Sequence, residues 1–148
     1  MKKNLGISLL EVMFSLAVIV VLLLAATRYY GSINSSRKVN DGVQQIKTLI
    51  GAIDQWRWQS KGIASVVVST SALAAAGLIP TSFNDANANP WGGIIIVEPV
   101  TASASGQVKI TFSNVPNGDC LNLIDVLTKD SITGSCNNNN FAGIYSPS

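Results

Sequence analysis

Histidine is absent from this 148-residue chain, and charged side chains make up only 12% of it. The commonest general base and the commonest metal ligand are therefore missing, which excludes Ser-His-Asp chemistry. So little charge leaves no basic face of the kind that binds nucleic acid. Because we also find no carboxylate pair, phosphate-binding loop or nucleophile arrangement, we expect no enzymatic activity, no cofactor and no metal ion.

Charge is scarcest in residues 7–26, which contain one acid, Glu11, and no base. As a helix, about 20 such residues span about 30 Å, the thickness of the hydrocarbon core of a membrane. Lys2 and Lys3 precede this segment and Arg28 follows it, a bias that places the N-terminus in the cytoplasm. The sequence therefore predicts a single membrane pass with the rest of the chain on the far side.

The helix is expected to continue beyond the membrane as an amphipathic segment from Ile33 to Trp56, with a stop at Gly62. Its apolar positions recur in steps of three and four, which puts them on one stripe: Val39, Val43, Ile46, Ile50 and Ile53. A stripe of this kind predicts that the second part of the helix packs on a folded domain.

The remainder predicts a small antiparallel sheet, so the fold class is α+β with a long N-terminal helix packed on that sheet. Short helices are expected over residues 71–76 and 120–129, the second capped by Asp119 and burying Leu121, Ile124 and Leu127 or Val126. Strands are expected over residues 94–98 and 108–112, with a possible edge strand over 141–145.

The chain has only two cysteines, Cys120 and Cys136, and both lie in the part that the N-terminal segment would deliver across a membrane. In an exported domain a disulfide is expected rather than a thiol site. It would close a loop of about 15 residues and stabilise the domain by about 3 kcal/mol.

Two ordinary explanations compete for the N-terminal segment. A secretory signal also begins with lysines, but its apolar region is shorter and ends at a small-residue site, for which Leu24-Ala25-Ala26 is a poor substitute. A plain signal anchor explains the membrane span but leaves Glu11 unexplained. An acid in lipid costs on the order of 2 kcal/mol or more, so its presence needs a reason.

The segment Gly6-Ile7-Ser8-Leu9-Leu10-Glu11 and the apolar run after it resemble the class III signal of type IV pilins and pseudopilins. The resemblance implies cleavage after Gly6 by a prepilin peptidase and N-methylation of the new terminus, Ile7. It also implies that Glu11 neutralises the terminal amine of a neighbouring subunit during assembly. The expected domains are a leader (1–6), a transmembrane and polymerisation helix (7–30) and an exported pilin head (31–148).

Residues 77–136 resemble type IVb pilins of the toxin-coregulated and conjugative thin-pilus type, through Gly77-Leu78-Ile79-Pro80, Asn89-Pro90-Trp91-Gly92-Gly93 and the approach to Cys120. The resemblance implies a helical homo-oligomer for adhesion, aggregation or conjugation, built from an inner-membrane precursor by the pilus assembly machinery. It also implies that the disulfide region is exposed on the pilus. Two alternatives stay open: a minor pilin or type II secretion pseudopilin, and a membrane-anchored binding module.

Two aromatic sites carry further expectations. Trp58 is expected to be partly exposed while Trp56 packs under the sheet; a contact between subunits is the alternative, since interfaces favour tryptophan. Trp91 is expected to anchor its loop on the domain. A calcium site using Asp85, Asn87 and Asn89 is the weaker interpretation, because calcium usually gathers several carboxylates.

Overall fold

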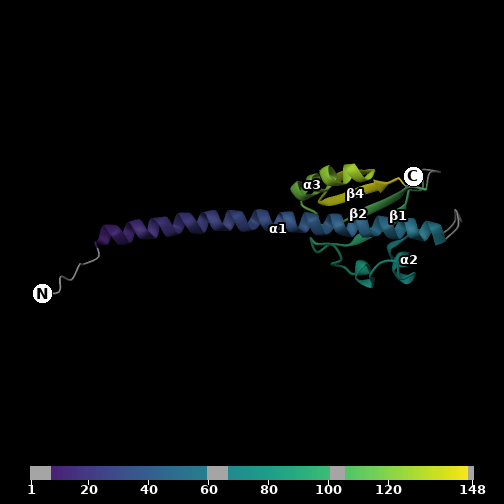
Figure 1. The fold of residues 1–148 in the computed structure, drawn as a ribbon, viewed down its shortest axis with the longest axis horizontal. Coiled ribbons are helices and arrows are strands. Elements are labelled where there is room, and N and C mark those ends of the chain that lie inside the picture. The colour runs from purple at the N-terminus through teal and green to yellow at the C-terminus, as the bar shows by residue number, and fades with distance from the viewer. Residues whose placement is uncertain (1–7, 60–66, 101–105, 147–148) are drawn as a thin grey trace. The chain divides into compact units, whose positions relative to one another are not determined.

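The computed structural model describes residues 8–59, 67–100 and 106–146. The chain divides into an N-terminal unit, Met1–Ser35, and a C-terminal unit, Ser36–Ser148. Helix α1, Leu9–Gln59, runs through both, and every other described element belongs to the C-terminal unit (Figure 1). The predicted cleavage and methylation positions, Gly6 and Ile7, lie outside the described residues.

The C-terminal part of α1 buries one side of the helix, as its apolar periodicity predicts. Its buried residues are Val39, Gly42, Val43, Ile46, Leu49, Ala52 and Ile53. Of the predicted stripe, only Ile50 is partly exposed, at the edge of the core. This buried side and one face of the sheet form a single hydrophobic core.

The sheet has four antiparallel strands in the order β1-β2-β4-β3. Their bounds are β1 Ile95–Pro99, β2 Val108–Phe112, β3 Ile132–Asn137 and β4 Asn140–Tyr145. Alternate residues face the core because successive strand side chains point to opposite faces. In β2 the inward residues are Val108, Ile110 and Phe112, and the Phe112 ring meets Phe141 of β4 edge-on, with ring centroids 6.4 Å apart.

The sequence-based prediction for the last two strands is wrong in two respects. Strand β4 is an interior strand between β2 and β3 and not an edge strand, and β3 was not predicted. The strands are joined by a two-residue turn in which Asn138 and Asn139 have φ of 47° and 57°. Asparagine tolerates this left-handed backbone, which matches the twist of a hairpin. The asparagine run is therefore a hairpin turn.

Helix α2, Thr70–Ala75, lies beside β1 (Figure 1). The Ser69 hydroxyl caps it by accepting a hydrogen bond from Ala72 N at 3.2 Å. The buried Thr70 hydroxyl donates to Ile95 O at 3.3 Å and accepts from Val97 N at 3.0 Å. The Ile94 carbonyl accepts a hydrogen bond from the N–H of Ser113, the residue after β2. Because backbone groups alternate in direction along a strand, the Ile95 carbonyl and the Val97 N–H point away from β2. Thr70 thus occupies backbone groups on the outer edge of β1.

Helix α3, Asn117–Leu127, begins earlier than predicted, with Pro116 and not Asp119 at the cap position. Its buried residues are Cys120, Leu123 and Leu127. Leu121, predicted to be buried, is 59% exposed. Successive helical residues are rotated by about 100°, so the inward position of Cys120 turns Leu121 towards the surface.

Candidate functional site

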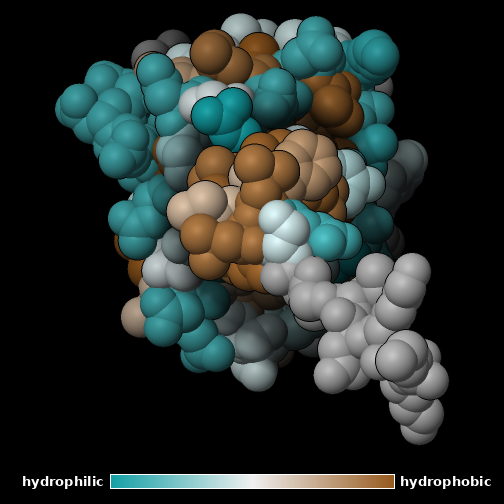
Figure 2. All heavy atoms as spheres, turned by 90° about the vertical axis from the view of Figure 1, so that its left-hand side faces the viewer, coloured by the Kyte–Doolittle hydropathy of each residue, from teal (hydrophilic) through white to brown (hydrophobic). Residues whose placement is uncertain are grey.

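The first candidate site is the apolar surface of the N-terminal unit. Its large hydrophobic side chains from Leu9 to Leu24 are exposed to between 44% and 77% of their area. Figure 2, viewed from the end where α1 begins, shows apolar side chains gathered on the surface there. The exposed large hydrophobic residues of this segment are Leu9, Leu10, Val12, Met13, Phe14, Leu16, Val18, Ile19, Val20, Val21, Leu22, Leu23 and Leu24. A continuous surface of this kind requires a cover of lipid or protein.

Two hydroxyl groups of helix α1 are bonded as a membrane environment requires. The Ser15 hydroxyl donates to the Glu11 carbonyl oxygen at 2.8 Å, and the Thr27 hydroxyl donates to the Leu24 carbonyl oxygen at 3.0 Å. These hydroxyls therefore carry their own partners within the helix, which is what a lipid environment demands. Helix α1 is long and apolar enough to cross a membrane.

Glu11 lies in the first turn of α1 and is exposed. Its backbone N–H donates to the Ser8 carbonyl oxygen at 2.9 Å. Among the residues that the structure describes, its carboxylate has no hydrogen-bonding or ionic partner. A carboxylate next to so much apolar surface needs a positive or hydrogen-bonding partner from outside that part of the chain.

The Ser8-Leu9-Leu10-Glu11 spacing is that of a capping box, in which a side chain three residues into the helix reaches back to the cap. In the structure the Glu11 N–H donates to the Ser8 carbonyl oxygen instead. Among the described residues neither side chain makes a capping hydrogen bond, so the box is not formed.

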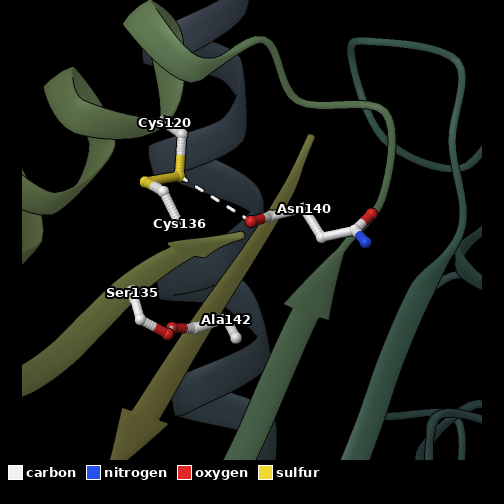
Figure 3. The surroundings of a disulfide bond; sticks show 5 residues. All are labelled: Cys120, Ser135, Cys136, Asn140 and Ala142. Atoms are coloured by element: carbon white, nitrogen blue, oxygen red, sulfur yellow. Dashed lines mark hydrogen bonds between the residues drawn. A yellow bond between two sulfur atoms is a disulfide. The ribbon is translucent and has the colours of Figure 1, made fainter. Parts of the chain in front are cut away.

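The second candidate site is the disulfide between Cys120 of α3 and Cys136 of β3, which confirms the predicted bridge (Figure 3). The two Cα atoms lie 6.1 Å apart, and the cysteines are separated by 16 positions. Cys120 is only 1% exposed. The bridge lies beside the start of β4, with the Cys120 sulfur 4.0 Å from the Asn140 carbonyl oxygen. It ties α3 to the last strand of the sheet, β3.

The loop before β1 is held by a buried asparagine. The Asn89 side-chain oxygen accepts hydrogen bonds from Trp91 N at 3.0 Å and Gly93 N at 2.9 Å. Its amide nitrogen donates to Ser113 O at 2.7 Å and Ile94 O at 3.3 Å. The oxygen that the calcium interpretation would use thus already holds the loop together.

Trp91 anchors this loop on the C-terminal unit, as predicted. Its ring packs against the core and lies over Gly42 of α1, where a Cβ atom would come within 2.8 Å of the ring. Its indole N–H donates to a carboxylate oxygen of Asp119 at 2.7 Å. The predicted cap residue of α3 therefore holds the indole, an interaction for which the sequence offers no local signal.

Tyr145 links β4 to α1 and was also missed. Its hydroxyl donates to the two carboxylate oxygens of Asp54, at 3.1 and 3.0 Å. Burial, and then the hydrogen bond and negative charge of Asp54, raise the pKa of Tyr145 above its ordinary value of 10.0, against an opposing effect of Arg57. The partners are 91 positions apart, so no local pattern could reveal them.

In a comparison with known families, a family model described as PilS N terminal matches residues 37–144. The matched range lies in the C-terminal unit and contains both cysteines, but not Glu11. A search of curated proteins and a search of solved structures each found no match. The match covers most of the chain, and a long apolar helix packed on a small antiparallel sheet is a pilin-like arrangement. The chain therefore belongs to the PilS N-terminal family, a family related to the type IV pilins.

Proposed function

We propose that this chain is a subunit of a type IV pilus, cut after Gly6 by a prepilin peptidase, N-methylated at Ile7 and polymerised through residues 7–30. The observation that carries the proposal is the exposed apolar segment of α1, residues 9–24, whose one acid, Glu11, lacks a partner among the described residues. Family membership supports the proposal independently, because the matched residues begin at 37 and exclude this segment.

The physical role of Glu11 follows from burial. In a filament core the apolar side chains would exchange lipid for neighbouring helices, and a carboxylate there would be left in a medium of low dielectric constant. A buried charge without a counter-charge costs about 3–5 kcal/mol. The terminal amine of Ile7 on an adjacent subunit supplies that counter-charge and sets the axial register of the two helices.

The subclass we propose is type IVb, with use in adhesion, aggregation or conjugation. It rests on the resemblance of residues 77–136. The orientation has the N-terminus in the cytoplasm, the precursor in the inner membrane and residues 31–148 exported. A minor pilin or pseudopilin is the alternative, and the amount of the chain in sheared surface fibres separates them, since a major pilin dominates that fraction.

Processing is tested by mass spectrometry of the mature chain from cells that carry the peptidase. We expect an N-terminus at Ile7 that bears one added methyl group. An intact Met1, or a cut near Ala26, would contradict the proposal and favour a plain anchor or a secretory signal.

Assembly is tested by Glu11→Gln, which removes the charge but keeps a polar side chain of nearly the same size. We expect normal amounts in the membrane and a drop of at least about tenfold in fibres, since the pair is buried. The matched control is Glu98→Gln, the other glutamate of the chain, in an exposed pair with Lys109 at 2.9 Å. Normal fibres from Glu11→Gln would rule out the pairing with the amine.

A further inference from the structure

Trp58 is the most exposed large hydrophobic side chain among the described residues, at 83%. It lies near the end of α1, two positions after Trp56, which packs against the core. Tryptophan is rarely left in water to this extent and is enriched among the residues that dominate protein interfaces. The exposed ring therefore points to a contact that the isolated chain does not complete.

The C-terminal unit also carries an open hollow of about 350 Å³. It is lined by Lys47, Ile50, Asp130, Ser131, Tyr145 and Ser146. One side is the ion pair between Lys47 and Asp130, with 3.1 Å between nitrogen and oxygen. The Tyr145 ring is fixed because its hydroxyl is bonded to Asp54.

This chemistry suits an indole. Ile50 offers an apolar surface, Tyr145 offers a ring for an aromatic contact, and Lys47 offers an ammonium group that can lie over an indole face. The two polar residues Ser131 and Ser146 lie in the same lining, where they can accept the indole N–H. The hollow is thus built for an aromatic side chain with one hydrogen-bond donor.

Trp58 does not fill the hollow of its own chain. Its side chain is 83% exposed and is not part of the lining. Lys47 and Trp58 are eleven positions apart on α1, which places them about 16 Å apart along the helix. The hollow is thus open to a side chain from another molecule.

We infer that Trp58 of one copy docks in the hollow of a second copy of this chain. When the α1 helices are parallel, the contact joins two different surfaces, so each bound copy still offers a free tryptophan on one side and a free hollow on the other. Head-to-tail contacts of this type propagate, whereas antiparallel copies would dock each other's tryptophan and close into a dimer. The inference rests on the proposed function, because a polymer of parallel α1 helices is what allows the contact to repeat.

The geometry also sets an offset between neighbouring copies. In side-by-side parallel helices, Trp58 must reach the level of Lys47 and Ile50, the two lining residues on α1, which lie eleven and eight positions earlier. At 1.5 Å per residue the two copies are staggered by about 12–16 Å along the helix axis.

The test uses the full chain in cells that assemble it, with the photoreactive substitution Trp58→p-benzoylphenylalanine, which keeps an aromatic side chain at position 58. Irradiation should yield a covalent dimer whose adduct maps by mass spectrometry to the hollow, at Lys47, Ile50 or Ser131. The control is Leu121→p-benzoylphenylalanine on α3, where the side chain is 59% exposed and no adduct in the hollow is expected. Adducts confined to other residues, or no dimer, in both membranes and sheared fibres would overturn the inference.

A second pair of variants measures the contribution of the contact. Trp58→Ala should lower the fibre yield by about tenfold or more, the loss typical of a dominant interface tryptophan, whereas Trp58→Phe should lose less. Wild-type yields from Trp58→Ala would overturn the inference while fibres from the unsubstituted chain still support the proposed function. If the unsubstituted chain makes no fibre, the proposed function fails. The crosslinked dimer formed in membranes then still shows whether Trp58 docks in the hollow.

Discussion

Helix α1 contains two stretches with the same backbone conformation. The apolar side chains are exposed in the first stretch and buried on one side of the helix in the second. In the N-terminal unit, Leu22 is 63% exposed and resembles its neighbours on all sides of the helix. In the C-terminal unit, Leu49 is fully buried and belongs to one side only. The first stretch obtains its cover from outside the chain, whereas the second obtains it from the sheet.

The difference shows that helix formation and helix burial are separate problems. Each stretch satisfies its backbone within α1, so neither needs the sheet to be helical. The arrangement of the apolar residues then decides the partner: all-round coverage suits lipid or a bundle of copies, and a single stripe suits one folded domain. The stability of the C-terminal unit should therefore be insensitive to substitutions in the first stretch.

Truncating one leucine in each stretch gives the largest expected contrast. Leu49→Ala removes a fully buried side chain and should lower the free energy of unfolding of the C-terminal unit by about 2–5 kcal/mol. Leu22→Ala should change it by less than about 0.5 kcal/mol. Urea unfolding in detergent micelles, followed by tryptophan fluorescence, measures both, because all three tryptophans lie beyond Ser36. Equal losses would mean that the two stretches share one cooperative core.

Opening the disulfide should have the next largest effect, again confined to the C-terminal unit. The double substitution Cys120→Ala and Cys136→Ala should lower the free energy of unfolding by about 3 kcal/mol for a loop of this length. Retention in the membrane during alkaline carbonate extraction should not change, since the anchor lies outside the loop. Loss of the chain from membranes would show instead that the bridge supports the anchor.

The glycines of α1 sharpen the comparison along one helix. At Gly42 an added Cβ would lie 2.8 Å from the Trp91 ring, so Gly42→Ala should cost about 1–3 kcal/mol through overpacking. At Gly51 a Cβ meets nothing within 4 Å, and Gly51→Ala should stabilise by about 0.5–1 kcal/mol. The same urea titration measures the change in the free energy of unfolding for both variants. If both variants were stabilised, the close packing of Trp91 on Gly42 would be contradicted.

Alkaline pH should give the smallest effect. The folded-state pKa of Tyr145 is raised above 10.0 because the phenol is partly buried and donates to Asp54. A raised pKa contributes stability that is complete below the unfolded value and is lost as the pH rises through the folded value. Thermal unfolding between pH 8 and pH 11 should therefore show a decline above about pH 10.

Tyr145→Phe is the matched control for that decline, because it keeps the ring and removes the titrating hydroxyl. The variant should be less stable at neutral pH and should lose part of the decline above pH 10. An unchanged alkaline decline in the variant would assign it to other groups, such as the lysines.

Sequence patterns predicted those parts of the molecule that depend on local periodicity or on residue type alone. Periodicity predicted the stripe on α1 and the alternation in β2. The pairing of Cys120 with Cys136 was predicted because these are the two cysteines of a domain that was expected to be exported. Strand β3 escaped prediction because Ile132 and Thr133 are its only strongly β-favouring residues, and it is held by pairing with β4.

The start of α3 was misplaced for a related reason. Asp119 is a good helix cap by type, but its carboxylate is bonded to the indole of Trp91, 28 positions away. Pro116, whose own backbone angles are those of a cap, precedes the helix instead. Likewise Asn89 and Tyr145 act through distant partners, which a local pattern cannot specify.

The Thr70 hydroxyl on the outer edge of β1 has a consequence for how copies meet. An open sheet edge is a template onto which another chain adds a strand, and such growth leads to amyloid-like aggregates. In β1 the carbonyl of Ile95 and the N–H of Val97 are already bonded to Thr70, and Pro99 has no N–H to offer. Another copy that meets the C-terminal unit at this edge therefore finds its outward hydrogen-bonding groups already occupied, and strand-to-strand growth there is blocked.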